Sequence, residues 1–248
     1  MSLQTTNVQI ATKMGESWGC WKGCRPVSTG CANCYSIMRL MPRWYPQNPQ
    51  QVTLNKDFNK PNRWKTPQMV FVCPLSDFFI DDPVANKWRP DAWNIMRNNP
   101  QHIFRISTKR PENIHAMLPN HWPYENVWLG VSTENQHWAD VRMDILRQIP
   151  IHQRAIRWIS AEPLLSTIRF SGPSSLASYG WCISGGESGD RKHPPRQANP
   201  QWFLDIAAQC QAANVPFMLK QLGGTGKCRC HKAYGCRAIN GQTFDQFP

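Results

Sequence analysis

Short runs of apolar and β-branched residues alternate along the chain with longer amphipathic stretches. The apolar runs, each of strand length, cover residues 69–73, 102–107, 127–132, 156–160, 181–184 and 217–219. The amphipathic stretches cover residues 91–98, 112–118, 136–149 and 201–213. Apolar residues at helical spacing supply one face to bury, so these stretches predict helices. Because strands that alternate with helices form parallel sheets, we expect an α/β fold, a complete or partial (β/α) TIM-like barrel of parallel strands.

The same pattern predicts two unequal parts. Residues 1–226 form the expected barrel domain, in which a polar leader and one short strand come first, and residues 227–248 form a Cys-rich C-terminal extension. Residues at about 42–68 are rich in proline and basic side chains and predict a long insertion. Long loops are often functional or mobile, so the insertion is either a solvated connector or a lid that contacts substrate.

Polar residues recur where the predicted strands end. In a parallel β/α barrel these C-terminal ends form the rim of the active site, so we expect the residues to surround one site. They are Asp77, Lys109, Arg110, Glu134, Asn135, Glu162, Glu187, Lys220 and Gln221. Gly185 and Gly186 precede Glu187; the glycines permit close approach to a ligand, and a carboxylate beside them can hold an ammonium group or a ribose hydroxyl.

Four cysteines crowd one short segment near the start of the chain, namely Cys20, Cys24, Cys31 and Cys34. No signal peptide opens the chain, so we expect a cytoplasmic protein, in which disulfides are rare. Thiolates that converge in a loop before a helix suit a metal ion or an iron–sulfur cluster. Spacing alone also permits a closed four-cysteine zinc site.

A second group of soft ligands lies in the C-terminal extension. Cys228, Cys230 and Cys236, with His231 between them, are arranged like a compact metal knuckle. We expect the three cysteines to bind a second metal, either zinc or iron–sulfur, and leave open whether His231 also binds. The alternative is a basic loop without redox chemistry.

The charge of the chain favours a polyanionic partner. There are 28 basic and 16 acidic residues, which gives a formal net charge of +12. Lysine and arginine gain from phosphate contacts and counterion release, so we expect a nucleic acid or nucleotide to bind. The chain also has 12 tryptophans, and exposed indoles could stack on unpaired bases. No apolar run is long enough to span a bilayer, so no membrane partner is expected.

Several motifs resemble those of one family. The first is Trp18 followed by a cysteine loop that ends in Ser28-Thr29-Gly30-Cys31-Ala32-Asn33-Cys34-Tyr35. Further matches lie at residues 74–79, 108–112, 128–135, 160–165, 185–189 and 220–221. Together they resemble a three-cysteine-motif family common in bacteriophages and prophages, a domain of unknown function that is similar to radical S-adenosylmethionine enzymes. Gly19 and Cys20 replace the Asn-Pro usual in that family, so Cys20 is an extra thiol whose role stays open.

The resemblance implies an iron–sulfur enzyme. Cys24, Cys31 and Cys34 would bind a 4Fe-4S cluster with one iron open to S-adenosylmethionine, and a reductant would drive cleavage to a 5′-deoxyadenosyl radical. The residues expected to hold the cofactor are Tyr35, Glu134, Glu162, Gly185, Gly186 and Glu187. Those expected on the substrate side are Asp77, Lys109, Arg110 and Lys220. Given the charge, the expected substrate is a nucleotide or nucleic-acid base.

Two other functions remain open on the sequence. One is a non-catalytic nucleic-acid-binding protein that zinc or iron–sulfur sites stabilise. The other keeps the cluster but uses it for redox sensing or DNA repair without cleaving the cofactor. A partner protein that supplies specificity is compatible with each of the three.

Overall fold

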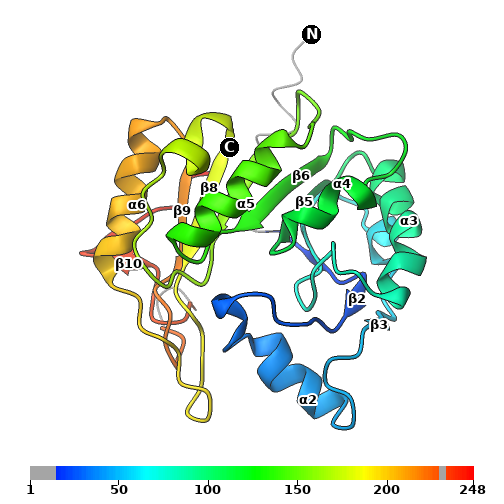
Figure 1. Cartoon of the computed structure of the whole chain (residues 1–248), viewed down its shortest axis with the longest axis horizontal. Coiled ribbons are helices and arrows are strands. Elements are labelled where there is room, and N and C mark those ends of the chain that lie inside the picture. The colour runs from blue at the N-terminus through cyan, green and yellow to red at the C-terminus, as the bar shows by residue number, and fades with distance from the viewer. Residues whose placement is uncertain (1–14, 229–232) are drawn as a thin grey trace.

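A seven-stranded parallel sheet forms the centre of the molecule, and it curls into a half-barrel (Figure 1). The computed structural model describes residues 15–228 and 233–248. Along the sheet the strands are β1 (Ser17–Trp18), β4 (Met69–Val72), β5 (Ile103–Thr108), β6 (Val127–Ser132), β7 (Arg157–Ala161), β8 (Trp181–Gly185) and β9 (Phe217–Gln221). This confirms the predicted fold as a partial TIM-like barrel.

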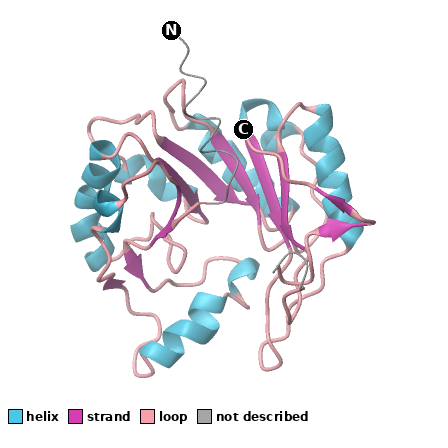
Figure 2. Ribbon diagram, turned by 180° about the vertical axis from the view of Figure 1, so that it is seen from behind, coloured by secondary structure: helices cyan, strands magenta, loops and turns pink. Residues whose placement is uncertain are grey.

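Helices cover the outer face of the half-barrel, as Figure 2 shows from behind. They are α3 (Pro83–Asn98), α4 (Ile114–Met117), α5 (Gln136–Gln148) and α6 (Pro200–Ala212). The connection between β7 and β8 has only the 3₁₀ turns Gly172–Ser174 and Leu176–Ser178, and another, Pro111–Asn113, precedes α4. None of these helices is long and apolar enough to cross a membrane, nor is any other helix in the described residues.

Side-chain caps fix where the three long helices begin. Asp82, Asn135 and Asn199 each accept a hydrogen bond from a backbone N–H in the first turn of α3, α5 and α6. Such caps satisfy donors that the helix itself leaves unpaired. The helix predicted over 91–98 was therefore too short: α3 begins at Pro83 and continues through Pro90.

Two apolar clusters hold the half-barrel together. The larger one fills the space between the sheet and the helices. The smaller one lies around Trp128, Trp158 and Trp181 near the N-terminal ends of the strands. The guanidinium of Arg105 lies 5.6 Å from the ring centroid of Trp158 and 5.1 Å from that of Trp181. Six of the tryptophans are buried in these clusters, so the indole-rich composition mainly reflects the core.

The segment that precedes β4 closes one side of the molecule. It contains a π-helical turn (Ser36–Leu40), α2 (Met41–Trp44), a 3₁₀ turn (Lys60–Arg63) and a small antiparallel ladder of β2 (Trp21–Lys22) with β3 (Thr53–Leu54). Within the proline-rich insertion, Val52 and Phe58 are buried, and the Phe58 carbonyl accepts a 2.8 Å bond from the Trp18 indole. The insertion is thus anchored to the core at Val52 and Phe58, while many of its other residues are exposed.

The C-terminal extension packs along β9. Its hairpin of β10 (Ala238–Ile239) and β11 (Gln242–Thr243) leads to Phe244, whose carbonyl accepts a 2.9 Å bond from the Leu219 amide. The carbonyl of Gln246 accepts a 2.9 Å bond from the indole of Trp181. The extension therefore covers the edge of the sheet that β9 would otherwise expose.

Candidate functional site

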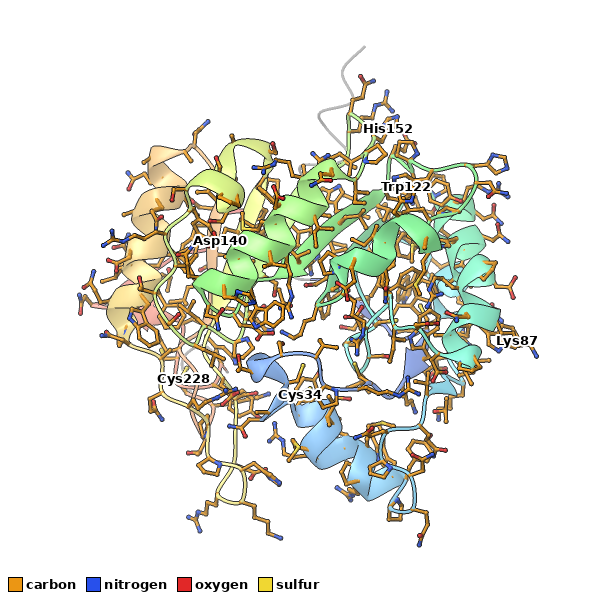
Figure 3. The ribbon with its side chains drawn as sticks, in the orientation of Figure 1. Cys34, Lys87, Trp122, Asp140, His152 and Cys228 are labelled. Atoms are coloured by element: carbon orange, nitrogen blue, oxygen red, sulfur yellow. The ribbon has the colours of Figure 1, made fainter. Side chains whose placement is uncertain are left out.

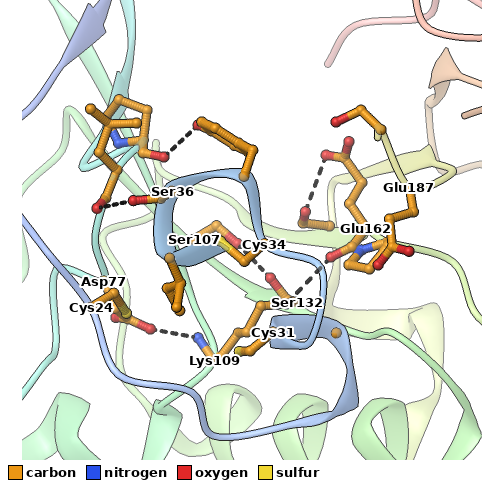
Figure 4. A pocket seen from close by; sticks show the side chains of 18 of the residues that line it. Cys24, Cys31, Cys34, Ser36, Asp77, Ser107, Lys109, Ser132, Glu162 and Glu187 are labelled. Atoms are coloured by element: carbon orange, nitrogen blue, oxygen red, sulfur yellow. Dashed lines mark hydrogen bonds between the residues drawn. The ribbon is translucent and has the colours of Figure 1, made fainter. Parts of the chain in front are cut away.

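A cavity of about 240 Å³ opens at the C-terminal ends of the strands (Figure 4). The loop with Cys24, Cys31 and Cys34 forms one wall, and the ends of β4 to β9 form the others. No residue of the 42–68 insertion lines this cavity, so the alternative of a substrate-contacting lid is not supported. The location agrees with the active-site end of parallel β/α barrels.

The three cysteines share this cavity without closing around a single point. Cys31 is buried, Cys24 and Cys34 are half-buried, and none of the three is in a disulfide. Within residues 15–228 and 233–248, no group of three or more His, Cys, Asp or Glu side chains is arranged to hold one metal ion. Cys20 is fully buried in the larger apolar cluster and does not line the cavity.

Burial favours the protonated form of the Cys24 and Cys34 thiols by raising the pKa of each. It raises the pKa of Cys24 to about 12, with a further contribution from Asp77, while the Arg110 guanidinium acts in the opposite direction. Burial also raises the pKa of Cys34. Since thiolates are the ligands of metals and clusters, occupation of this wall requires the release of protons.

Glu134, which follows β6, binds the cysteine loop at Ser28 and Gly30. Its carboxylate is fully buried and accepts bonds from Ser28 Oγ (2.6 Å), the Gly30 amide (2.7 Å), Lys109 Nζ (2.5 Å) and Arg142 Nη1 (3.2 Å). Burial alone would raise the pKa of Glu134, but Lys109, Ser28 and Arg142 together hold it below its ordinary value. With four donors on two oxygens, this carboxylate immobilises the loop instead of facing the cavity.

Gly30 owes its identity to this contact. A Cβ atom at position 30 would lie 2.3 Å from the carboxyl carbon of Glu134. Such a separation is far inside van der Waals contact, and the obstacle is a carboxylate that buried partners already fix. The loop can therefore approach Glu134 only with glycine here.

Glu187 holds the other end of the same loop. It accepts bonds from Asn33 Nδ2 (2.8 Å) and the Arg196 amide (2.9 Å), and the Arg196 guanidinium binds both of its oxygens. Arg196 Nη1 also donates to the Thr29 carbonyl at 3.0 Å. Burial opposes ionisation of Glu187, but the bonds from Arg196 and Asn33 lower its pKa overall. Glu187 and Arg196 thus clamp the turn between Cys31 and Cys34.

Asp77 and Arg110 form a third attachment. Asp77 is buried and accepts bonds from Thr108 Oγ1 (2.6 Å), the Lys109 amide (2.9 Å) and Arg110 Nη1 (3.2 Å). Arg110 Nη2 donates to the Arg25 carbonyl at 2.6 Å. In addition, Arg110 Nη1 lies 3.6 Å from the sulfur of Cys24. The structure brings both predicted residues to the cavity wall, where they anchor the cysteine loop.

Glu162 and Lys220 face the cavity from the opposite side. Lys220 Nζ lies 2.8 Å from Glu162 Oε1, and Ser160 Oγ donates to Glu162 Oε2 at 3.3 Å. Beside them, Ser107 and Ser132 lie with their hydroxyl oxygens 3.5 Å apart. Within the part of the chain that the structure describes, neither Glu162 nor Lys220 hydrogen-bonds to the cysteine loop, so this pair supplies charges of both signs to the cavity.

The remaining predicted cofactor residues also lie at the cavity or beside it. Tyr35 lines it and donates from its hydroxyl to the Pro74 carbonyl at 2.7 Å. A Cβ at Gly186 would lie 2.0 Å from the Leu222 carbonyl oxygen, and one at Gly185 would lie 2.7 Å from Glu162 Oε1. The two glycines thus allow close packing between β8, β9 and Glu162.

The predicted second metal centre is only partly described. Cys228 and Cys236 are half-buried, and the Cys236 carbonyl accepts a 2.8 Å bond from the Leu222 amide. Cys230 and His231 lie outside the described residues. A metal at this knuckle stays a prediction.

The fold and the site define a half-barrel α/β protein with a three-cysteine pocket at its mouth. The profile of one family, described as "Protein of unknown function (DUF5131)", matches residues 8–248. The chain therefore belongs to this family. Comparisons with curated proteins and with solved structures gave no match. Because the family carries no assigned activity, function has to be argued from the pocket.

Proposed function

We propose that the protein is an iron–sulfur enzyme of the radical S-adenosylmethionine type that acts on a nucleotide or nucleic acid. One observation carries the proposal: three thiols share a wall of the cavity at the C-terminal ends of parallel strands, opposite the Glu162–Lys220 pair. Thiolates are the usual ligands of iron–sulfur clusters, and this end of a β/α barrel is where active sites lie.

The donor set suits a cluster better than a single ion. A closed zinc site needs four ligands around one point, whereas a cluster presents several irons over which its ligands can spread. Cys24, Cys31 and Cys34 share the cavity without such convergence, and Cys20 is buried in the core. Three cysteine ligands would leave one iron of a 4Fe-4S cluster available to another molecule.

The chain's own residues divide the remaining work. Glu134, Glu187 and Arg110 fix the cysteine loop and so determine where a cluster would lie. Glu162 could accept bonds from the ammonium group of S-adenosylmethionine, and Lys220 could donate to its carboxylate. Together, the bound cluster and cofactor would supply a one-electron cleavage that yields an organic radical. The apolar cluster around Trp158 would limit the entry of water from the other end of the half-barrel.

The substrate assignment rests on charge. The formal net charge of +12 favours phosphate-bearing molecules. At the cavity itself, Lys109 is committed to Glu134, while Lys220 is 46% exposed and pairs with Glu162. Because Lys220 is the donor proposed for the cofactor carboxylate, the phosphates of the substrate have to meet basic residues farther out from the cavity.

Anaerobic reconstitution tests the proposal. The protein, supplied with iron, sulfide, a reductant and S-adenosylmethionine, should bind iron and sulfide in equal amounts and release 5′-deoxyadenosine. Alanine at Cys24, Cys31 or Cys34 should abolish both results, whereas Cys20→Ala should leave the cluster with its open iron. A reduced, cluster-loaded protein that never consumes the cofactor would remove the enzyme claim. A colourless protein with bound zinc would favour the non-catalytic alternative.

A further inference from the structure

The segment that leads out of the cysteine loop carries an unusual share of exposed apolar side chains. Five large hydrophobic residues of the described chain are well exposed, and four of them are Val27, Tyr35, Met38 and Trp44. Met38 and Trp44, 41% and 42% exposed, lie on the π-helical turn and α2. This helical arm hangs beside the open end of the half-barrel (Figure 1). Single exposed hydrophobics are ordinary, but four of them on one segment that also supplies Tyr35 to the cavity wall indicate a binding surface.

The same segment carries positive charges that no acidic residue of its own balances. From Ser17 to Lys56 the sequence contains no aspartate or glutamate, and its basic residues are Lys22, Arg25, Arg39, Arg43 and Lys56. Arg25 and Arg39 pair with carboxylates of other segments. The Lys22 ammonium lies 5.0 Å from the ring centroid of Trp44. Lys22 and Arg43 form no ion pair with any residue that the structure describes.

A second basic element faces this arm across the mouth. Arg191 and Lys192 are exposed in the loop that follows β8, and neither has a carboxylate within ion-pairing distance in the part of the chain that is described. Arg39 Nη1 lies 3.2 Å from Asp190 Oδ2, which joins the loop to the arm. The loop and the arm, which this ion pair ties together, make up the rim.

We propose that an unpaired nucleic-acid strand binds along this rim. The rim surface consists of Lys22, Met38, Arg43, Trp44, Arg191 and Lys192. Its cations would contact phosphates, and Trp44 and Met38 would pack against bases, which present their faces only when unstacked from a partner strand. A second copy of the chain fits poorly, because it would bring uncompensated positive charges together.

This inference deepens the proposed function by placing the substrate strand, but the binding itself needs neither cluster nor cofactor. It is therefore tested separately. Fluorescence anisotropy of the full-length protein, with and without reconstituted cluster, would measure affinity for labelled oligothymidylate and oligouridylate over a range of salt concentrations. The two oligonucleotides distinguish DNA from RNA, and light scattering in parallel detects self-association.

Each part of the rim has a matched control. Trp44→Ala should weaken binding about tenfold, the loss of one stacked base, whereas Val141→Ala, an exposed apolar change on α5, should have no effect. Arg43→Glu should weaken binding strongly. Lys87→Glu makes the same change in net charge on α3, at the edge of the molecule (Figure 3), and should weaken it much less.

The second basic element is tested by salt dependence. The Arg191→Ala, Lys192→Ala double variant should reduce the slope of log affinity against log salt concentration by roughly 1.4, at about 0.7 per phosphate contact.

Three results would overturn the inference. The first is no binding of either strand at low salt by a folded protein. The second is equal weakening by Arg43→Glu and Lys87→Glu, which would mean that net charge alone attracts the strand. The third is a Trp44→Ala variant whose mass in solution falls while its affinity for the oligonucleotides stays the same. This result would mean that the rim joins two copies of the chain. Release of 5′-deoxyadenosine by a protein that fails to bind strands would leave the proposed chemistry intact and remove only the rim.

Discussion

Glu134 and Glu162 follow neighbouring strands of the half-barrel, yet their surroundings differ completely. Glu134 is fully buried, and its oxygens accept from four donors: two on the cysteine loop, Lys109 just after β5, and Arg142 on α5. The Glu162 side chain is 20% exposed, pairs with Lys220 and lines the cavity. Both are polar strand ends, but one is committed to holding a loop and the other is available to a ligand. Position at a strand end therefore identifies the residues of the site. Only their contacts distinguish the residues that hold the cysteine loop from those that can bind a ligand.

Removal of the Glu134 carboxylate should have the largest effect on stability. In Glu134→Ala, Lys109 and Arg142 would lose their shared counter-charge, and Arg142 is almost fully buried. Loss of one partner from a buried ion pair costs about 3–5 kcal/mol. Denaturant unfolding of the variant against Glu162→Ala measures the difference. If both variants lose the same free energy of unfolding, the two carboxylates do not differ in their contribution to stability.

Gly30→Ala should have the next largest effect. The new methyl group would meet the Glu134 carboxylate at 2.3 Å, so the loop must move away. Overpacking of this kind costs about 1–3 kcal/mol, and we expect iron uptake to fall because Cys31 moves with the loop. Gly226→Ala is the control, since a Cβ there meets nothing within 4 Å. Wild-type iron content in Gly30→Ala would show that the loop position does not matter for the cluster.

The strands were predictable because their chemistry is local. Parallel strands buried on both faces are continuous apolar runs, and β6 extends over the predicted residues 127–132. The start of α3 was missed because Pro90 lies within the helix, where proline ordinarily ends one. The Asp82 cap and Pro83 at the first position were the sequence features that mark its true start.

The contacts of the site were less predictable because they join distant parts of the chain. The polar strand ends could be placed on one rim from their position alone. That Gly30 would bond Glu134, or Asn33 would bond Glu187, depends on how the cysteine loop folds over β6 and β8. Arg196 was missed altogether because it lies in a proline-rich loop outside every periodic element.

Strong acid should loosen the cysteine loop, because the two carboxylates that hold it must then be protonated. The folded-state pKa values of Glu134 and Glu187 lie below their ordinary values. Their stabilising contribution is therefore complete above the unfolded pKa of about 4.3 and is lost as pH falls through the lower folded values. Unfolding free energies measured from neutral pH downward should decline below about pH 4.3. Glu187→Gln should flatten that decline, whereas an unchanged profile would contradict the assigned role of Glu187.

The smallest effect on stability should come from the pair that faces the cavity, and this is where the comparison is sharpest. Lys220→Ala removes a partly exposed ion pair, which is worth only about 0–1 kcal/mol. Its thermal unfolding should therefore match that of the wild-type protein closely. Binding of S-adenosylmethionine to the cluster-loaded variant, measured by calorimetry, should nevertheless weaken, because the cavity loses the donor that we propose for the cofactor carboxylate. Lys60→Ala, which removes an exposed ion pair with Glu16 elsewhere, is the matched control. If both variants bind the cofactor with the same affinity, Lys220 has no part in cofactor binding. Glu162 would then be the one member of the pair that is available to a ligand.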